Sequence, residues 1–120
     1  MSKVLVIEDD ALVREALRRV LKQGGYEVFE AQDGDEGLSL FSRVSPDLVI
    51  TDIIMPNKDG LETIVELRRR SPETKVVAIS GGGHMKGEDY LDVADRLGAA
   101  KTLVKPFGSK TLLETLEGLL

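Results

Sequence analysis

Short runs of apolar residues alternate along this chain with longer segments in which apolar residues recur at helical spacing. An unbroken apolar run is typical of a strand that is buried on both faces of a parallel sheet. Apolar residues spaced three or four apart form one face of a helix. The pattern predicts strands at residues 4–7, 48–50, 76–79 and 102–104, and a more polar strand nearer a sheet edge at residues 27–31.

A helical stripe follows each of these strands, so the chain consists of strand–helix units. Asp10, Asp33 and Ser109 are expected to cap three of the helices, and Gly24 with Gly25 to end the first. Strands that alternate with helices favour a parallel sheet covered on both faces, because parallel crossovers place helices there. The sequence therefore predicts a single α/β domain, built as (βα)5, over residues 1–120.

The composition of the chain excludes several kinds of binding site and partner. The 120 residues include no cysteine, which excludes disulfides and thiolate metal sites. A net charge of −5 argues against direct binding to nucleic acid, and the arginines at 68–70 are explained by the end of a helix. No apolar run has the length of a membrane span and the first residues do not resemble a signal peptide, so no membrane partner and a cytoplasmic location are expected.

Polar residues follow four of the predicted strands at the point where each strand ends: Glu8 with Asp9, then Asp52, Ser80 and Lys105. The carboxyl ends of parallel strands lie at one edge of the sheet, where open α/β sheets bind ligands. These side chains are therefore expected to converge there and to be partly desolvated.

Carboxylates that lie close together repel one another and raise one another's pKa unless a cation lies between them. Mg²⁺ prefers oxygen ligands and, at phosphoryl sites, takes one or two carboxylates with water and phosphate oxygens. Lys105 would add a compact positive charge for a phosphate oxygen, and Ser80 a hydroxyl donor. The residues predict that Asp52 attacks phosphorus to form an acyl phosphate, beside a metal held by Glu8 and Asp9.

These motifs resemble those of the receiver domain of two-component response regulators, over essentially the entire chain. The matching residues are Glu8-Asp9, the segment 52–56 with Asp59-Gly60, then Ser80, and Lys105-Pro106-Phe107. Together, in this order and each at a strand end, they are highly specific. The resemblance implies a flavodoxin-like fold, with a five-stranded parallel sheet in the order 2-1-3-4-5 and helices on both faces.

The resemblance also implies a chemistry and a cofactor. In that family the aspartate matching Asp52 is phosphorylated by a histidine kinase or a histidine phosphotransfer protein, with Mg²⁺ present. The metal ligands would be the carboxylates of Glu8, Asp9 and Asp52 and the backbone carbonyl of Ile54. Such a protein is a phosphoacceptor signalling domain, and it carries out only its own phosphorylation and dephosphorylation.

The resemblance further implies how the phosphoryl group is sensed. Ser80 and Lys105 would bind its oxygens, together with backbone N–H groups of Ile53 and Gly81, and Ser80 would act as a switch. A cis peptide bond is expected before Pro106. The signal would reach the face formed by the fourth helix, fifth strand and fifth helix, where an unidentified downstream protein would bind. A phosphorylation-dependent dimer is compatible with the same resemblance.

Two positions depart from the family pattern. Glu8 stands where aspartate is commoner, and its longer side chain would shift the metal slightly. Thr102 stands where the family often has Tyr or Phe as a rotamer switch, so relay through an aromatic flip is not implied here.

Other functions stay open at this point. A phosphatase of the haloacid dehalogenase type also uses a strand-end aspartate with Mg²⁺, but it needs a second aspartate where this chain has Ile54. A degenerate receiver used only for docking is disfavoured by the presence of Asp52, Ser80 and Lys105. Asp10 is explained by capping without a metal. The residues identify neither the kinase nor the target, nor whether the receiver acts alone or within a longer regulator.

Overall fold

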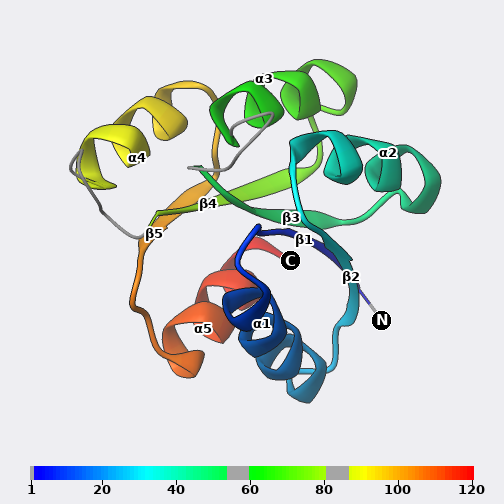
Figure 1. Ribbon diagram of the computed structural model, residues 1–120, viewed down its shortest axis with the longest axis vertical. Coiled ribbons are helices and arrows are strands. Elements are labelled where there is room, and N and C mark those ends of the chain that lie inside the picture. Colours follow the sequence, from blue (N-terminus) through cyan, green and yellow to red (C-terminus); the bar gives the residue numbers. More distant parts are fainter. Residues whose placement is uncertain (1, 54–59, 81–86) are drawn as a thin grey trace.

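A single parallel sheet, with helices on both faces, organises the protein (Figure 1). The computed structural model describes residues 2–53, 60–80 and 87–120. Its strands are β1 (Lys3–Ile7), β2 (Glu27–Ala31), β3 (Leu48–Asp52), β4 (Lys75–Ser80) and β5 (Lys101–Val104). Its helices are α1 (Ala11–Gln23), α2 (Gly34–Val44), α3 (Gly60–Arg70), α4 (Gly87–Arg96) and α5 (Ser109–Leu119).

The strand order is β2-β1-β3-β4-β5, and each neighbouring pair is parallel, which confirms the predicted fold. The polar strand β2 lies at an edge, as its composition predicted. Since the chain passes from β2 back across β1 to β3, the order reverses at β1 and β3. The carboxyl ends of these two strands form the edge at which such sheets bind ligands.

Successive side chains of each strand point to opposite faces of the sheet, so they contribute to two separate hydrophobic cores. Leu5 and Ile7 of β1 face the core that α2, α3 and α4 cover. Val4 and Val6 face the other core, which is covered by α1 and α5. Figure 1 shows the same division, with α1 and α5 on one side of the sheet and the other helices opposite. No helix in the described part of the chain is long and apolar enough to cross a membrane.

Two of the three predicted helix caps are confirmed. The Asp10 side chain accepts hydrogen bonds from the N–H groups of Leu12 and Val13, at 2.9 and 3.3 Å. Asp33 caps α2 by accepting the Glu36 N–H at 2.8 Å. The prediction for α5 is wrong.

The N-cap of α5 is Gly108, which has an extended backbone and makes no side-chain cap hydrogen bond. Ser109 is already the first helical residue, so its hydroxyl group does not occupy the capping position. Lys105 is thus followed by only a short link before α5 begins.

Candidate functional site

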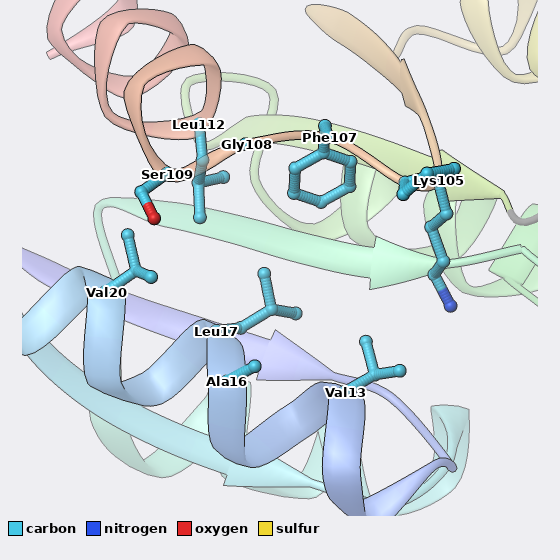
Figure 2. Close-up of a pocket in the computed structure, with 10 residues that line it drawn as sticks. Val13, Ala16, Leu17, Val20, Lys105, Phe107, Gly108, Ser109 and Leu112 are labelled. Atoms are coloured by element: carbon cyan, nitrogen blue, oxygen red, sulfur yellow. The ribbon is translucent and has the colours of Figure 1, made fainter.

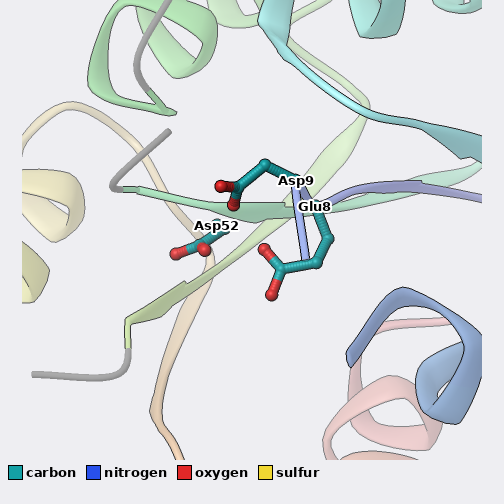
Figure 3. A group of neighbouring side chains, drawn as sticks. All are labelled: Glu8, Asp9 and Asp52. Atoms are coloured by element: carbon teal, nitrogen blue, oxygen red, sulfur yellow. The ribbon is translucent and has the colours of Figure 1, made fainter. Parts of the chain in front are cut away.

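Three carboxylates from two neighbouring strands meet at the carboxyl edge of the sheet (Figure 3). Glu8 and Asp9 directly follow β1, and Asp52 is the last residue of β3. One oxygen from each lies within 4.8 Å of the other two. Glu8 and Asp52 are buried, at 0% and 6% exposure, whereas Asp9 is exposed. The predicted convergence of these acids is therefore present in the structure.

Lys105 directly follows the edge strand β5, and its side chain reaches two of these acids at the same carboxyl edge of the sheet (Figure 2). Its Nζ donates to Glu8 Oε1 at 2.6 Å and to Asp52 Oδ2 at 3.2 Å. Its backbone N–H donates to the Ser80 carbonyl at 2.8 Å, which ties the end of β5 to the end of β4. The hydrogen bonds of the Lys105 side chain and backbone thus hold its amine against both buried carboxylates.

The period-two alternation of the strands explains why these three side chains meet. Glu8, Asp52 and Lys105 each come two positions after a residue that faces the core of α1 and α5, so they continue rows on the same face. Those preceding residues are Val6, Ile50 and Leu103. Ser80 comes two positions after Ala78, which faces the opposite core.

Burial shapes the electrostatics of the cluster. Removal from water, followed by the hydrogen bond and negative charge of Asp52, raises the pKa of Glu8 to about 8, although Lys105 acts in the opposite direction. Burial also disfavours charge on Lys105. Its hydrogen bond to Glu8 and the two negative charges outweigh burial, so the pKa of Lys105 is raised. In the absence of a cation, the site therefore disfavours the charged form of Glu8.

The raised pKa of Glu8 predicts a stability that depends on pH. Between its ordinary pKa of 4.5 and about 8, the folded protein keeps a proton that the unfolded chain has lost. The free energy of unfolding of the metal-free protein should therefore fall as pH rises through this window, by about 1.4 kcal/mol per unit of difference between the two pKa values.

Urea unfolding at a series of pH values, with a chelator present, measures this effect. Glu8→Gln cannot lose a proton, so its unfolding free energy should decline less steeply than that of the wild type. Parallel pH profiles for the two proteins would show that Glu8 does not titrate in this window.

Two buried polar atoms at the site have no hydrogen-bond partner among the described residues. They are Glu8 Oε2 and the Ser80 hydroxyl oxygen. Burying such atoms without a partner costs free energy, so native proteins rarely leave them unsatisfied. A divalent cation would satisfy the carboxylate oxygen, and an anionic oxygen would accept from the hydroxyl. With their oxygen donors, the residues present fit Mg²⁺ and a phosphoryl group.

The other predicted site residues have mixed outcomes. The peptide bond between Lys105 and Pro106 is cis, as the resemblance implied. Thr102 is half-buried in β5 and pairs with Ala78 of β4. The N–H of Ile53 donates to Ile79 at 3.0 Å within the sheet, so a role in phosphoryl binding would have to share this bond and stays a prediction. Ile54, Gly81 and the motif residues 55–59 lie outside the described residues.

Two hydrogen bonds that support the site were not predicted from the sequence. Arg14 donates from its guanidinium to the backbone carbonyl of Glu8 at 2.8 Å. Gly60 donates its N–H to the carbonyl of Ile53, the residue that follows Asp52, at 2.7 Å. The Asp59-Gly60 motif pointed to the glycine, but not to this close approach of two backbones. Arg14 looked like any polar residue on the solvent side of an amphipathic helix.

Several known proteins are similar to this chain in sequence and in fold. Residues 4–117 match the family model of the response regulator receiver domain. The chemotaxis protein CheY of Listeria monocytogenes is 34% identical over 98% of this chain and 97% of its own length. The crystal structure of CheY4 from Vibrio cholerae matches with a TM-score of 0.90 and 32% sequence identity. The match covers 100% of this chain and 99% of the CheY4 chain.

Longer regulators match as well. The probable transcriptional regulator ycf27 of Porphyridium aerugineum is 41% identical over 92% of this chain, and the response regulator MprA of Mycobacterium sp. is 38% identical over 98%. This chain spans about half of their lengths, 45% and 50%. The family match, these relatives and the parallel 2-1-3-4-5 sheet agree, and the chain belongs to the response regulator receiver domain family.

Proposed function

We propose that this domain receives a phosphoryl group on Asp52 from a histidine kinase or a histidine phosphotransfer protein, in a reaction that requires Mg²⁺. The observation that carries the proposal is the cluster of Glu8, Asp9 and Asp52, with Lys105 hydrogen-bonded to its two buried members. The cytoplasmic location expected from the sequence is part of the same proposal.

The chain's own residues supply the nucleophile and the charge balance. An Asp52 oxygen forms the new bond to phosphorus while the bond from phosphorus to the donor nitrogen breaks, and the electron pair of that bond stays on the nitrogen. Lys105 is held where it can offset negative charge on the transferring oxygens, and the unpartnered Ser80 hydroxyl can donate to one of them.

The carboxylates of Glu8, Asp9 and Asp52 would hold the metal, with the backbone carbonyl of Ile54 as the fourth protein ligand. When bound, the ion would supply positive charge that offsets the negative charge of the phosphoryl oxygens. The raised pKa of Glu8 fits a site that is completed by a cation, since a divalent charge favours the ionised carboxylate.

The relay of the signal starts from the same contacts. Lys105 and Ser80 are joined through their backbones, so a phosphoryl group that draws both side chains would act on the ends of β4 and β5 together. We expect the response to appear on the face of α4, β5 and α5, where a downstream protein binds. Thr102 lies on β5 in place of the usual aromatic residue, so any side-chain movement there would involve a small hydroxyl-bearing group.

Phosphorylation by a small phosphodonor tests the proposal. The protein is incubated with acetyl phosphate or phosphoramidate, with Mg²⁺ and with a chelator, and the mass of the intact chain is followed. We expect one phosphoryl group per chain with Mg²⁺ and little without it. Equal labelling with and without the ion would refute the metal requirement, whereas catalytic release of phosphate from many added phosphomonoesters would indicate a phosphatase of the haloacid dehalogenase type.

A further inference from the structure

The guanidinium group of Arg14 binds the strand end that carries the acidic pair. Its NH1 donates to the Glu8 carbonyl oxygen at 2.8 Å, in a partly buried contact. The pairing of β1 with β2 ends at Ile7 and Ala31, one residue before this carbonyl. Arg14 thus provides a hydrogen bond at the point where the regular pairing of these two strands stops.

The segment from Glu8 to Asp10 is fixed at each end. The Glu8 N–H donates to the Ala31 carbonyl at 3.0 Å, and the Glu8 carbonyl accepts from Arg14. Asp10 caps α1 with its side chain, and its carbonyl accepts from the Arg14 N–H at 2.9 Å. Asp9 lies between these anchors, so its carboxylate is positioned by the backbone on either side of it.

Arg14 is itself held in place from β2. Its Nε lies 3.5 Å from Glu30 Oε1, and its side chain is only 19% exposed. Arg18, one turn further along α1, lies 3.6 Å from Glu30 Oε2 and is 34% exposed. Both arginines therefore share Glu30, but it is Arg14 that donates a hydrogen bond to the acidic segment.

We propose that Arg14 is a positioning residue for the metal: it holds the Glu8 carbonyl so that the carboxylates of Glu8 and Asp9 face Asp52 before the ion binds. This inference rests on the proposed function. It assigns to a cation a supporting role at a cation site, which charge alone would not predict. Groups that orient metal ligands typically contribute tenfold or more to metal affinity.

If the charge of Arg14 dominated, its removal would change the Mg²⁺ affinity in the opposite direction from that expected if Arg14 positions the ligands. This difference allows a sharp test. A positive charge near the cluster repels Mg²⁺, so its removal would tighten binding if charge dominated. Removal of the hydrogen bond loosens the ligands and would weaken binding. Arg14→Met removes the hydrogen bond and the charge while keeping an unbranched apolar stem. Arg18→Met removes an equal charge from the same helix and serves as the matched control.

Calorimetric titration of Mg²⁺ into the full chain, at fixed ionic strength, measures the effect. We expect Arg14→Met to weaken Mg²⁺ binding about tenfold, Arg18→Met to leave it unchanged or slightly tighter, and Arg14→Lys to restore most of the loss. Amide exchange at Glu8, whose N–H donates to the Ala31 carbonyl, should become faster in Arg14→Met and not in Arg18→Met. If Arg14→Met does not fold, Arg14→Gln is measured in its place and the same weakening is expected.

The other outcomes overturn the inference in different ways. Binding by Arg14→Met that is as tight as in the wild type, or tighter, would show that charge dominates. Equal weakening in both methionine variants would show a general loss of structure around Glu30. A wild type that binds no Mg²⁺ would overturn the proposed metal site as well, whereas binding that depends on Asp52 but not on Arg14 would overturn this inference alone.

Discussion

Asp52→Asn is expected to abolish phosphorylation by small phosphodonors. The substitution keeps the shape of the side chain but replaces the nucleophilic carboxylate with an amide, whose oxygen is a poor nucleophile. It also removes one of the three carboxylates from the cluster and the negative partner of Lys105 at 3.2 Å. Intact-mass measurement after incubation with acetyl phosphate and Mg²⁺ should show only the unmodified chain.

Asp47→Asn is the matched control, because Asp47 lies just before β3 and Asp52 ends it. Asp47 is exposed and accepts a hydrogen bond from the Lys3 N–H at 2.8 Å, at the opposite edge of the sheet. Its substitution should leave phosphorylation at the wild-type level. Full labelling of Asp52→Asn, at any residue, would show that position 52 is not the acceptor.

Gly60→Ala is expected to destabilise the protein by about 3 kcal/mol or more. A Cβ atom at this position would collide with the Asp52 carbonyl oxygen and would lie 2.5 Å from Ile53 Cα. Both obstacles are backbone atoms, so neither can turn aside as a flexible side chain would. To relieve the collision, α3 has to move away from the end of β3, which also displaces Asp52.

Urea unfolding measures the loss, and Gly118→Ala provides the control. Gly118 lies in α5, and a Cβ atom there would have no neighbour within 4 Å. Because alanine is the better helix former, this second substitution should be neutral or stabilising, by up to about 1 kcal/mol. A Gly60→Ala protein as stable as the wild type would show that the two backbones can separate at no cost.

The fold was predictable because its signals are local and repeated. Each buried strand is an unbroken apolar run, each helix has one apolar stripe, and the caps at Asp10 and Asp33 follow from the side chains themselves. The cap at Ser109 was predicted wrongly because serine is acceptable either at the cap or in the first turn. Residue type alone does not decide between the two when glycine precedes it.

The candidate site was predictable to the level of residues but not of contacts. Strand ends and period-two alternation place Glu8, Asp52 and Lys105 together. They do not reveal that Lys105 pairs with the longer Glu8 side chain at 2.6 Å, closer than with Asp52. The role of Arg14 was also missed, since its contact with the Glu8 carbonyl depends on how α1 packs against the end of β1.

A crystal structure grown with Mn²⁺, which binds the same oxygen ligands as Mg²⁺ and is located by its anomalous signal, would test the metal cluster directly. We expect one peak at the carboxyl edge of the sheet, bound by Asp52 and, directly or through water, by Glu8 and Asp9. A peak elsewhere, or no peak while Lys105 stays paired with Glu8 and Asp52 at saturating Mn²⁺, would contradict the proposal that these acids form a metal site for phosphoryl transfer.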